Sequence, residues 1–197
     1  MNTTQNEGWL DRRETVAEML RDRGTLLLVC GLGGTTWDAS AVSQSPLDFH
    51  LWGAMGNAAM IGLGLALTQP ERPVLVVTGD GEMLMNVGVL ATVATLAPQN
   101  LSIVCIDNGC HGETGGQPGH TAMNTDLALM AKGAGLASTM TVNTADDLAE
   151  EAFVVLRDAL RQAGKVGLGQ LSMRGQEKLV AIKPCGKGLL METLRYA

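Results

Sequence analysis

The sequence is poor in aromatic residues and in positive charge, and both shortages exclude classes of function. Aromatic residues make up 3% of the 197 residues, so rings on which nucleic-acid bases could stack are scarce. Lys and Arg number 14 against 20 Asp and Glu, a formal net charge of -6 at pH 7. Non-specific nucleic-acid binding needs a basic surface. We therefore expect no nucleic-acid partner.

Long apolar runs and paired cysteines are also lacking. The longest apolar stretch, residues 54–67, is too short to span a bilayer. Residues 2–8 are polar and residues 9–23 heavily charged, which is not the pattern of a secretory signal. The cysteines lack metal-type spacing, and two of them fall in expected strands, which suits a reducing compartment; they are Cys30, Cys105, Cys110 and Cys185. We expect a cytoplasmic protein with no membrane partner.

What the chain does have is an alternation of apolar runs and helical patterns. Strands are expected at residues 25–30, 49–52, 74–78, 101–107, 138–142 and 166–173. Helices are expected at residues 9–23, from 53–56 through 67, and at 82–96, 126–132 and 144–162, with polar loops at 38–48 and 109–124. This alternation predicts an α/β fold with a doubly wound parallel sheet.

The domain organisation follows from length and from the absence of a linker. A chain of 197 residues suits one α/β domain spanning residues 1–197. Residues 1–8 are expected to form a disordered tail and residues 174–197 a C-terminal extension. That extension carries five basic side chains, which could clamp an anionic substrate or form an exposed tail or partner-binding arm; they are Arg174, Lys178, Lys183, Lys187 and Arg195.

Two polar turns end neighbouring expected strands. Gly79-Asp80-Gly81 follows residues 74–78, and Asp107-Asn108-Gly109 closes residues 101–107. A right-handed crossover through the intervening helix makes the two strands parallel, so both turns emerge at the carboxyl edge, where ligands bind. Asp80 and Asn108 offer the oxygen ligands that Mg²⁺ prefers, and Gly81 can admit a phosphate to a helix N-terminus.

Each of these features has a structural alternative. Asp80 alone could simply cap a helix after a tight turn; the second turn at crossover distance favours the metal site. The glycine-rich turn 31–36 could cradle a diphosphate with its backbone N–H groups or be a flexible turn. The small residues of the helix that reaches residue 67 suit close packing in a core or a subunit interface.

These motifs together resemble a known family. The strings GDGEMLMNVGVLATVA, PQNLSIVCIDNGCHGETGGQ and DFHLWGAMGNAAMIGLGLAL are similar to the thiamine diphosphate (ThDP)-binding β subunit of sulfopyruvate decarboxylase and to phosphonopyruvate decarboxylase. The similarity runs from about residue 25 to about residue 135. It implies a ThDP-binding fold with ThDP and Mg²⁺ as cofactors.

The resemblance also implies roles for individual residues. Gly53 would give a backbone oxygen to the cofactor aminopyrimidine, Met55 would prop the cofactor into a bent shape, and the backbone oxygen of Cys110 would complete the metal shell of Asp80 and Asn108. The full set of expected cofactor-binding residues is Gly31, Gly33, Gly53, Ala54, Met55, Gly79, Asp80, Gly81, Glu82, Asn108, Cys110 and His111.

The polar loop 109–124 supplies the candidate catalytic residues. His120, His111 and Glu113 could transfer protons or bind an anion, with His120 the first choice because imidazole titrates near neutral pH. The alternative for each is a solvated loop residue. His111 stands where the family usually has Tyr, which puts its substrate contacts in question.

The implied activity is decarboxylation of a small 2-oxo acid, 3-sulfopyruvate or 3-phosphonopyruvate. In this family a glutamate on a separate pyrimidine-binding domain activates the cofactor, and this chain has motifs only for the diphosphate domain. We therefore expect a pyrimidine-binding α subunit as partner. Two other functions stay open: the β subunit of a ThDP-dependent 2-oxoacid:acceptor oxidoreductase, and a non-catalytic Mg-diphosphate-binding regulatory module.

Overall fold

The structure is a computed structural model that describes residues 10–21, 23–143, 167–173, 176–185 and 188–193. Contacts between residues divide the chain into two compact units. One unit is Leu10–Thr141, and the other combines Met1–Trp9 with Val142–Ala197. The sequence led us to expect one domain. Because the structure has two units, each is described by itself.

The first unit contains a parallel sheet of four strands in the order β2-β1-β3-β4. The strands are β1 (Leu27–Cys30), β2 (Asp48–His50), β3 (Val74–Gly79) and β4 (Leu101–Ile106). β1 pairs with both β2 and β3, and β3 pairs with β4, all in parallel. The chain order reverses between β1 and β3, and ligands bind at such a switch point, outside the carboxyl ends of the strands.

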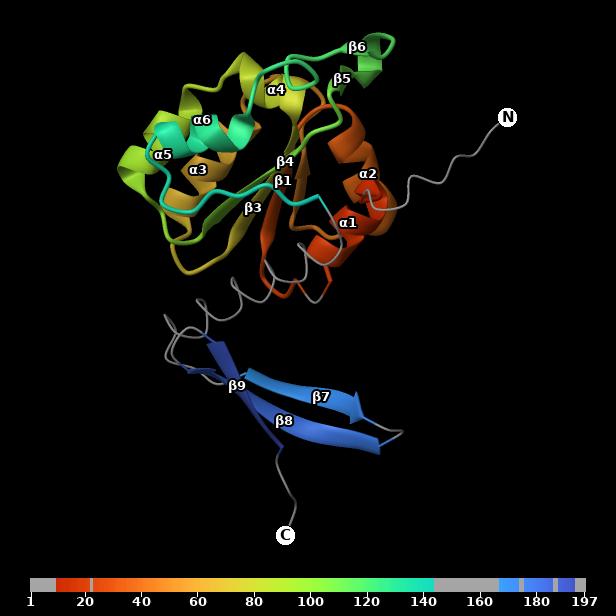
Figure 1. The fold of residues 1–197 in the computed structure, drawn as a ribbon, viewed down its shortest axis with the longest axis vertical. Helices are drawn as coiled ribbons and strands as arrows, with labels where there is room; N and C mark the ends of the chain where they lie inside the picture. The colour runs from red at the N-terminus through yellow and green to blue at the C-terminus, as the bar shows by residue number, and fades with distance from the viewer. Residues whose placement is uncertain (1–9, 22, 144–166, 174–175, 186–187, 194–197) are drawn as a thin grey trace, which may run out of the picture. The chain divides into compact units, whose positions relative to one another are not determined.

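Helices cover both faces of this sheet (Figure 1). On one face lie α1 (Arg12–Met19) and α2 (Gly34–Val42); on the other lie α3 (Ala58–Thr68), α5 (Val89–Leu96) and α6 (Leu127–Gly133). A short helix, α4 (Asp80–Met85), directly continues β3. The doubly wound α/β fold expected from the sequence is confirmed.

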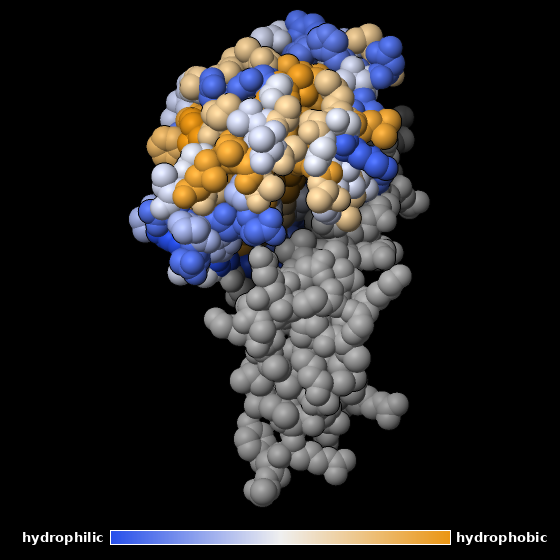
Figure 2. Space-filling model, turned by 90° about the vertical axis from the view of Figure 1, so that its left-hand side faces the viewer, coloured by the Kyte–Doolittle hydropathy of each residue, from blue (hydrophilic) through white to orange (hydrophobic). Residues whose placement is uncertain are grey.

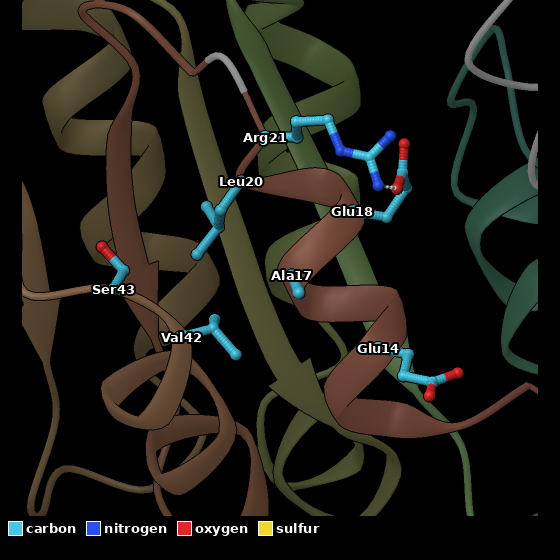
Figure 3. A pocket seen from close by; sticks show the side chains of 7 residues that line it. All are labelled: Glu14, Ala17, Glu18, Leu20, Arg21, Val42 and Ser43. Atoms are coloured by element: carbon cyan, nitrogen blue, oxygen red, sulfur yellow. Dashed lines mark ion pairs between the residues drawn. The ribbon is translucent and has the colours of Figure 1, made fainter.

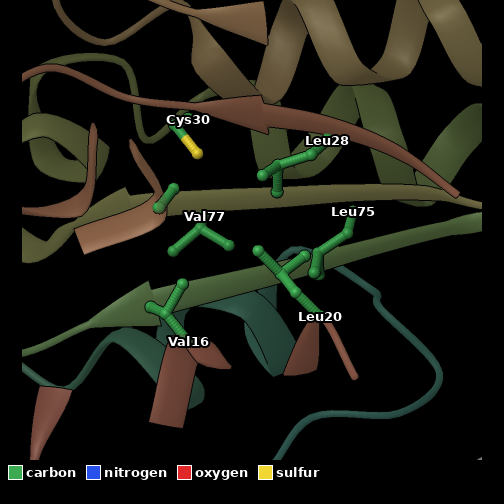
Figure 4. Packing of buried hydrophobic residues seen from close by; sticks show 7 residues of the cluster. Val16, Leu20, Leu28, Cys30, Leu75 and Val77 are labelled. Carbon is green, nitrogen blue, oxygen red and sulfur yellow. The ribbon is translucent and has the colours of Figure 1, made fainter. Parts of the chain in front are cut away.

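The alternation of side chains along β1 and β3 builds two cores. Leu28 and Leu75 pack against Val16 and Leu20 of α1 (Figure 4), whereas Val76 packs on the α3 side with Ala58. All five of these strand and α1 residues are less than a tenth exposed. Strands buried on both faces read as continuous apolar runs, which is why 74–78 contains no polar residue before Thr78.

The structure corrects four sequence expectations. Residues 38–48 are not all loop, because α2 continues to Val42. The expected helix 82–96 is two helices, α4 and α5, separated at residues 86–88, where Gly88 is the N-cap of the second. Residues 138–142 form no strand. The loop 109–124 contains a small antiparallel hairpin of β5 (Cys110–His111) and β6 (Gln117–Pro118), joined through η1 (Gly112–Thr114).

The second unit contains a three-stranded antiparallel sheet in the order β7-β8-β9. Its strands are β7 (Gly167–Met173), β8 (Gln176–Cys185) and β9 (Gly188–Thr193). The expected last strand, 166–173, is therefore a strand, but in a separate sheet. Within the expected C-terminal extension, residues 176–185 and 188–193 pair backbone to backbone as β8 and β9, whereas its basic side chains as a substrate clamp or partner-binding arm stay a prediction. The expected helix 144–162 and the tail 1–8 lie outside the described residues.

Candidate functional site

The carboxyl edge of the parallel sheet brings together the segments that the sequence singled out. β3 and β4 are paired along their length, and Gly79 lies opposite Ile106. Asp80 and Asp107 therefore leave adjacent strands at the same level. The glycine-rich turn after β1 and residues 51–57 after β2 emerge at this edge as well.

Asp80 is a buried carboxylate at the start of α4. Its side chain is 4% exposed, and its Oδ2 accepts a 2.9 Å hydrogen bond from Thr121 Oγ1. The same hydroxyl lies 2.7 Å from Asp107 Oδ1, so one threonine connects the turns after β3 and β4. A side chain added at Gly119 would lie 3.2 Å from Asp80 Oδ2. The loop is thus closed over Asp80, and neither Thr121 nor Asp107 was among the expected site residues.

Asn108 is exposed, and its side-chain oxygen accepts a 3.0 Å hydrogen bond from the backbone N–H of Cys110. Asp107 makes the equivalent bond to the N–H of Gly109, also at 3.0 Å. These two Asx-type turns fix the path of the chain after β4 and hold residues 108–110 at the sheet edge. Gly109 has a φ of 64°, which glycine adopts without strain.

Glu82, one turn into α4, is the second buried acid of the site. It is 6% exposed, accepts a 2.7 Å hydrogen bond from Thr78 Oγ1, and accepts a 3.3 Å bond from the backbone N–H of Gly56. Its carboxylate also lies where a side chain at Gly31 would have to be. Glu82 therefore ties the turn after β1, the end of β3 and the loop before α3 into one arrangement. That role was not evident from the sequence, which only places Glu82 beside the GDG motif.

The loop before α3 is held in an unusual conformation. Ala54 has a φ of 54° and Gly56 a φ of 81°; a positive φ at a non-glycine residue is often associated with a functional site. Asn57 Nδ2 donates to the carbonyl oxygens of Ala54, at 3.1 Å, and Met55, at 3.3 Å. The Met55 side chain, fixed by this turn, remains 48% exposed at the edge of the sheet.

Two of the three candidate catalytic residues face glycines of the site. A side chain at Gly81 would lie 3.1 Å from His111 Nδ1, and one at Gly33 would lie 3.1 Å from Glu113 Cγ. His111 is partly buried and Glu113 exposed. His120, the first choice from the sequence, is exposed, and its carbonyl oxygen accepts backbone hydrogen bonds from Met123 and Thr125. The structure thus favours His111 and Glu113 over His120 as residues facing the site.

The thiols near the site are poorly suited to ionise. Burial is the main cause that raises the pKa of both Cys30 and Cys105 to about 12. The charge of Asp48 adds to the shift at Cys30, and that of Asp80 to the shift at Cys105. All three cysteines whose side chains are described, Cys30, Cys105 and Cys110, are free. Within the described residues no group of three or more His, Cys, Asp or Glu is arranged to hold a metal ion, which leaves the expected set of one carboxylate, one amide and one carbonyl untested.

A separate hollow of about 590 Å³ lies between α1 and the end of α2 (Figure 3). It is lined in part by Glu14 and by the Glu18–Arg21 ion pair of α1, and by Val42 and Ser43. Val42 ends the nine-residue helix that Gly34 begins, so this hollow is about 12 Å along the helix from the glycine-rich turn. None of the expected site residues lines it.

Comparison with known proteins identifies the family of this fold. The family described as "Thiamine pyrophosphate enzyme, C-terminal TPP binding domain" matches residues 33–166. The chain belongs to this family of thiamine pyrophosphate enzymes. The match includes residues 33–36 of the glycine-rich turn, the GDG turn and the loop after β4, and it covers three of the four strands of the parallel sheet, β2, β3 and β4.

Three curated relatives are similar to the chain. It is 39% identical over 125 residues to sulfopyruvate decarboxylase subunit beta of Methanocaldococcus jannaschii, covering 64% of this chain and 65% of the relative. The corresponding subunit of Methanothermobacter thermautotrophicus is 41% identical over 135 residues, 68% of this chain and 69% of the relative. Phosphonopyruvate decarboxylase of Streptomyces viridochromogenes is 36% identical over 163 residues, 79% of this chain but only 40% of the relative.

A second similarity covers the C-terminal unit. The family described as "Ku70/Ku80 beta-barrel domain" matches residues 137–197. The non-homologous end joining protein Ku of Methylocella silvestris is 41% identical over 51 residues, 26% of this chain and 19% of the relative. This match coincides closely with the second compact unit. It agrees with the finding that β7 belongs to an antiparallel sheet rather than to the parallel one.

Proposed function

We propose that the chain is the ThDP- and Mg²⁺-binding subunit of a 2-oxoacid decarboxylase that acts on 3-sulfopyruvate or 3-phosphonopyruvate. The substrate assignment rests on the names of the relatives, which are sulfopyruvate and phosphonopyruvate decarboxylases. The observation that carries the cofactor assignment is the buried Asp80 at the switch point of the parallel sheet, within the residues that the family matches. Around it the glycines at 31, 33 and 81 let the side chains of Glu82, Glu113 and His111 pack closely against the backbone of the turns.

The residues present suit the cofactor. Asp80, the Asn108 amide and the carbonyl oxygen of Cys110 would supply hard oxygen ligands to Mg²⁺. Gly31, Gly33, Gly53, Gly79 and Gly81 would let the backbone approach the cofactor, and Met55 would support its bent shape. When bound, ThDP supplies the carbon nucleophile and the electron sink for loss of CO₂. Glu82 would hold the loop that contacts the cofactor in place.

The candidate catalytic side chains act in proton transfer in this proposal. His111 would donate or accept a proton at the edge of the site, where its Nδ1 faces Gly81. Glu113, exposed beside Gly33, would assist it. His120 is kept as an alternative donor.

The glutamate that activates the cofactor would come from a pyrimidine-binding α subunit. The relatives named subunit beta imply such a partner. In the phosphonopyruvate decarboxylase the matched part is 40% of a longer chain, so the remaining part of that chain would correspond to the partner here. The free thiols of Cys30, Cys105 and Cys110 support a reducing, cytoplasmic compartment. Separately, no helix among the described residues is long and apolar enough to cross a membrane.

The cofactor test is substitution of Asp80. Asp80→Ala should weaken Mg-ThDP binding by the assembled complex roughly 100-fold, because a charged metal ligand is lost. Asp126→Ala removes another carboxylate, the N-cap of α6 that accepts from Leu129 N at 2.8 Å, and should leave the affinity unchanged. Equal Mg-ThDP affinity in the Asp80 variant and the wild type would refute the proposal.

The activity test separates the alternatives. The complex should release CO₂ and the free aldehyde from 3-sulfopyruvate or 3-phosphonopyruvate. Turnover only with an electron acceptor would assign it to the oxidoreductases, and tight ThDP binding without CO₂ release would favour a regulatory module. The Ku similarity covers 19% of the Ku relative, and we propose no end-joining role from it.

A further inference from the structure

Two tryptophans form an exposed pair at the carboxyl edge of the parallel sheet. Trp37 is 55% exposed and Trp52 is 62% exposed. Their ring centroids lie 5.0 Å apart, with an angle of 73° between the ring planes, an edge-to-face contact. The pair joins residues from two different connections, the first turn of α2 and the segment after β2. We call it the Trp37–Trp52 pair.

The backbone around the pair is anchored to the site. The Trp37 N–H donates to Gly33 O at 3.3 Å, and the N–H of Leu51, next to Trp52, donates to Cys30 O at 3.0 Å. Trp52 immediately precedes the loop with the positive φ at Ala54. The backbone that carries the two indoles is therefore held by the same strand ends and turns that position the glycines of the candidate site.

The pair leaves a large apolar surface in contact with water. Each indole leaves on the order of 100 Å² of apolar surface in water, and Met55, 48% exposed, follows three residues after Trp52. Exposed apolar patches mark interaction sites, and tryptophan is enriched among the residues that dominate binding energy at interfaces. The two rings contact each other and still leave more than half of each side chain exposed.

We propose that the Trp37–Trp52 pair is the docking anchor for the pyrimidine-binding α subunit. This inference rests on the proposed function. In the phosphonopyruvate decarboxylase the matched part is 40% of the chain, and the proposed α subunit would correspond to the part that lies outside the match. That subunit must meet the carboxyl edge of the sheet, since the site lies there. An exposed aromatic pair beside the site is a surface on this edge that can supply the required binding energy.

A second apolar surface provides matched controls. Hydrophobic residues gather on the face seen in Figure 2. Separately, Met60 and Leu67 of α3 are 40% and 49% exposed. Leu67 lies at the opposite end of α3 from the loop that follows Trp52. Leu67→Ala, like Trp52→Ala, removes a side chain that is about half exposed, but at a distance from the site.

The test uses the purified α subunit with which the wild-type chain reconstitutes CO₂ release. Its affinity is measured by titration against wild type, Trp52→Ala, Trp52→Phe and Leu67→Ala, with the urea midpoint of each free chain as a folding check. We expect Trp52→Ala to raise the Kd about 30-fold or more, as for a dominant interface residue. Trp52→Phe should recover much of that loss, and Leu67→Ala should stay within about threefold of wild type.

The outcomes distinguish the two proposals. If no α subunit reconstitutes CO₂ release, the proposed function fails. If reconstitution succeeds but Trp52→Ala leaves the Kd unchanged and alters only the KM for ThDP, the indoles serve the cofactor and the docking inference is overturned. It is also overturned if Leu67→Ala weakens α-subunit binding as much as Trp52→Ala does. If Trp52→Ala loses self-association while its affinity for the α subunit is unchanged, the pair belongs to a contact between copies of this chain. That result would also refute the docking inference.

Discussion

Gly62 should be the position where α3 tolerates a side chain least. An ideal Cβ at Gly62 would lie closer than 3.0 Å to Val76 Cγ2, a separation real Cβ atoms essentially never show, and 3.5 Å from Leu101 Cδ1. Val76 is fully buried in the central part of β3 and β-branched, so its χ1 angle is restricted and it can move aside only at an energetic cost. Gly62→Ala must therefore push α3 away from the sheet.

The change in unfolding free energy on Gly62→Ala is the sum of a packing cost and a gain in helix propensity. Adding a methyl group to a packed core costs about 1–3 kcal/mol, whereas replacing a helical glycine by alanine stabilises by about 1 kcal/mol. On the same helix, a Cβ at Gly64 would meet nothing within 4 Å. Gly64→Ala should therefore gain the stabilisation from the higher helix propensity of alanine without any packing cost. The two alanine variants should then differ in unfolding free energy by about 1–3 kcal/mol, with Gly62→Ala the less stable.

Urea unfolding followed by tryptophan fluorescence measures this difference. Trp37 and Trp52 both lie in the parallel-sheet unit, so the signal reports mainly on that unit. With urea m-values of about 1–3 kcal/mol/M, the midpoints of the two variants should be separated by roughly 1 M. If Gly62→Ala and Gly64→Ala shift the midpoint equally and in the same direction, α3 is not pressed onto β3 at Gly62 and the reasoning fails.

Two further predictions concern Asp48 and the thiols. Burial would raise the pKa of Asp48, but hydrogen bonds from Ser43 and Arg23, with the charge of Arg23, lower it below its usual 3.8. The stability from this ion pair is therefore full above pH 3.8 and is lost as the pH falls through the lower folded pKa. Asp48→Asn should cost about 3 kcal/mol at pH 7, and this cost should fall as the pH is lowered below 3.8, measured by urea unfolding at a series of pH values. A cost that stays constant down the series would contradict this prediction. Alkylation with iodoacetamide at pH 8, mapped by mass spectrometry, should modify Cys110 in the native chain and reach Cys30 only after unfolding, since burial raises the pKa of Cys30 to about 12; native-state labelling of Cys30 at the rate of Cys110 would show that its burial is wrong.

The sequence by itself determined the sheet and the position of its ligand-binding edge. Apolar runs such as 74–78 cannot be exposed on either face, so their burial between two layers of helices follows from composition alone. The polar turns at Asp80 and Asn108 mark where those strands end, and the crossover rule puts both turns at one edge. Both signals depend only on residues that are close together in the sequence, so they do not require knowledge of the tertiary structure.

Only the tertiary structure decided which side chains meet at that edge. Thr121 joins Asp80 to Asp107 across 41 and 14 positions of sequence, and Glu82 reaches the backbone of Gly56, 26 positions away. No periodicity encodes contacts of this kind, because they depend on how a loop folds back over the strand ends. The same holds for the Trp37–Trp52 contact and for β7, whose apolar pattern predicts a strand but does not specify the sheet in which its backbone finds a partner.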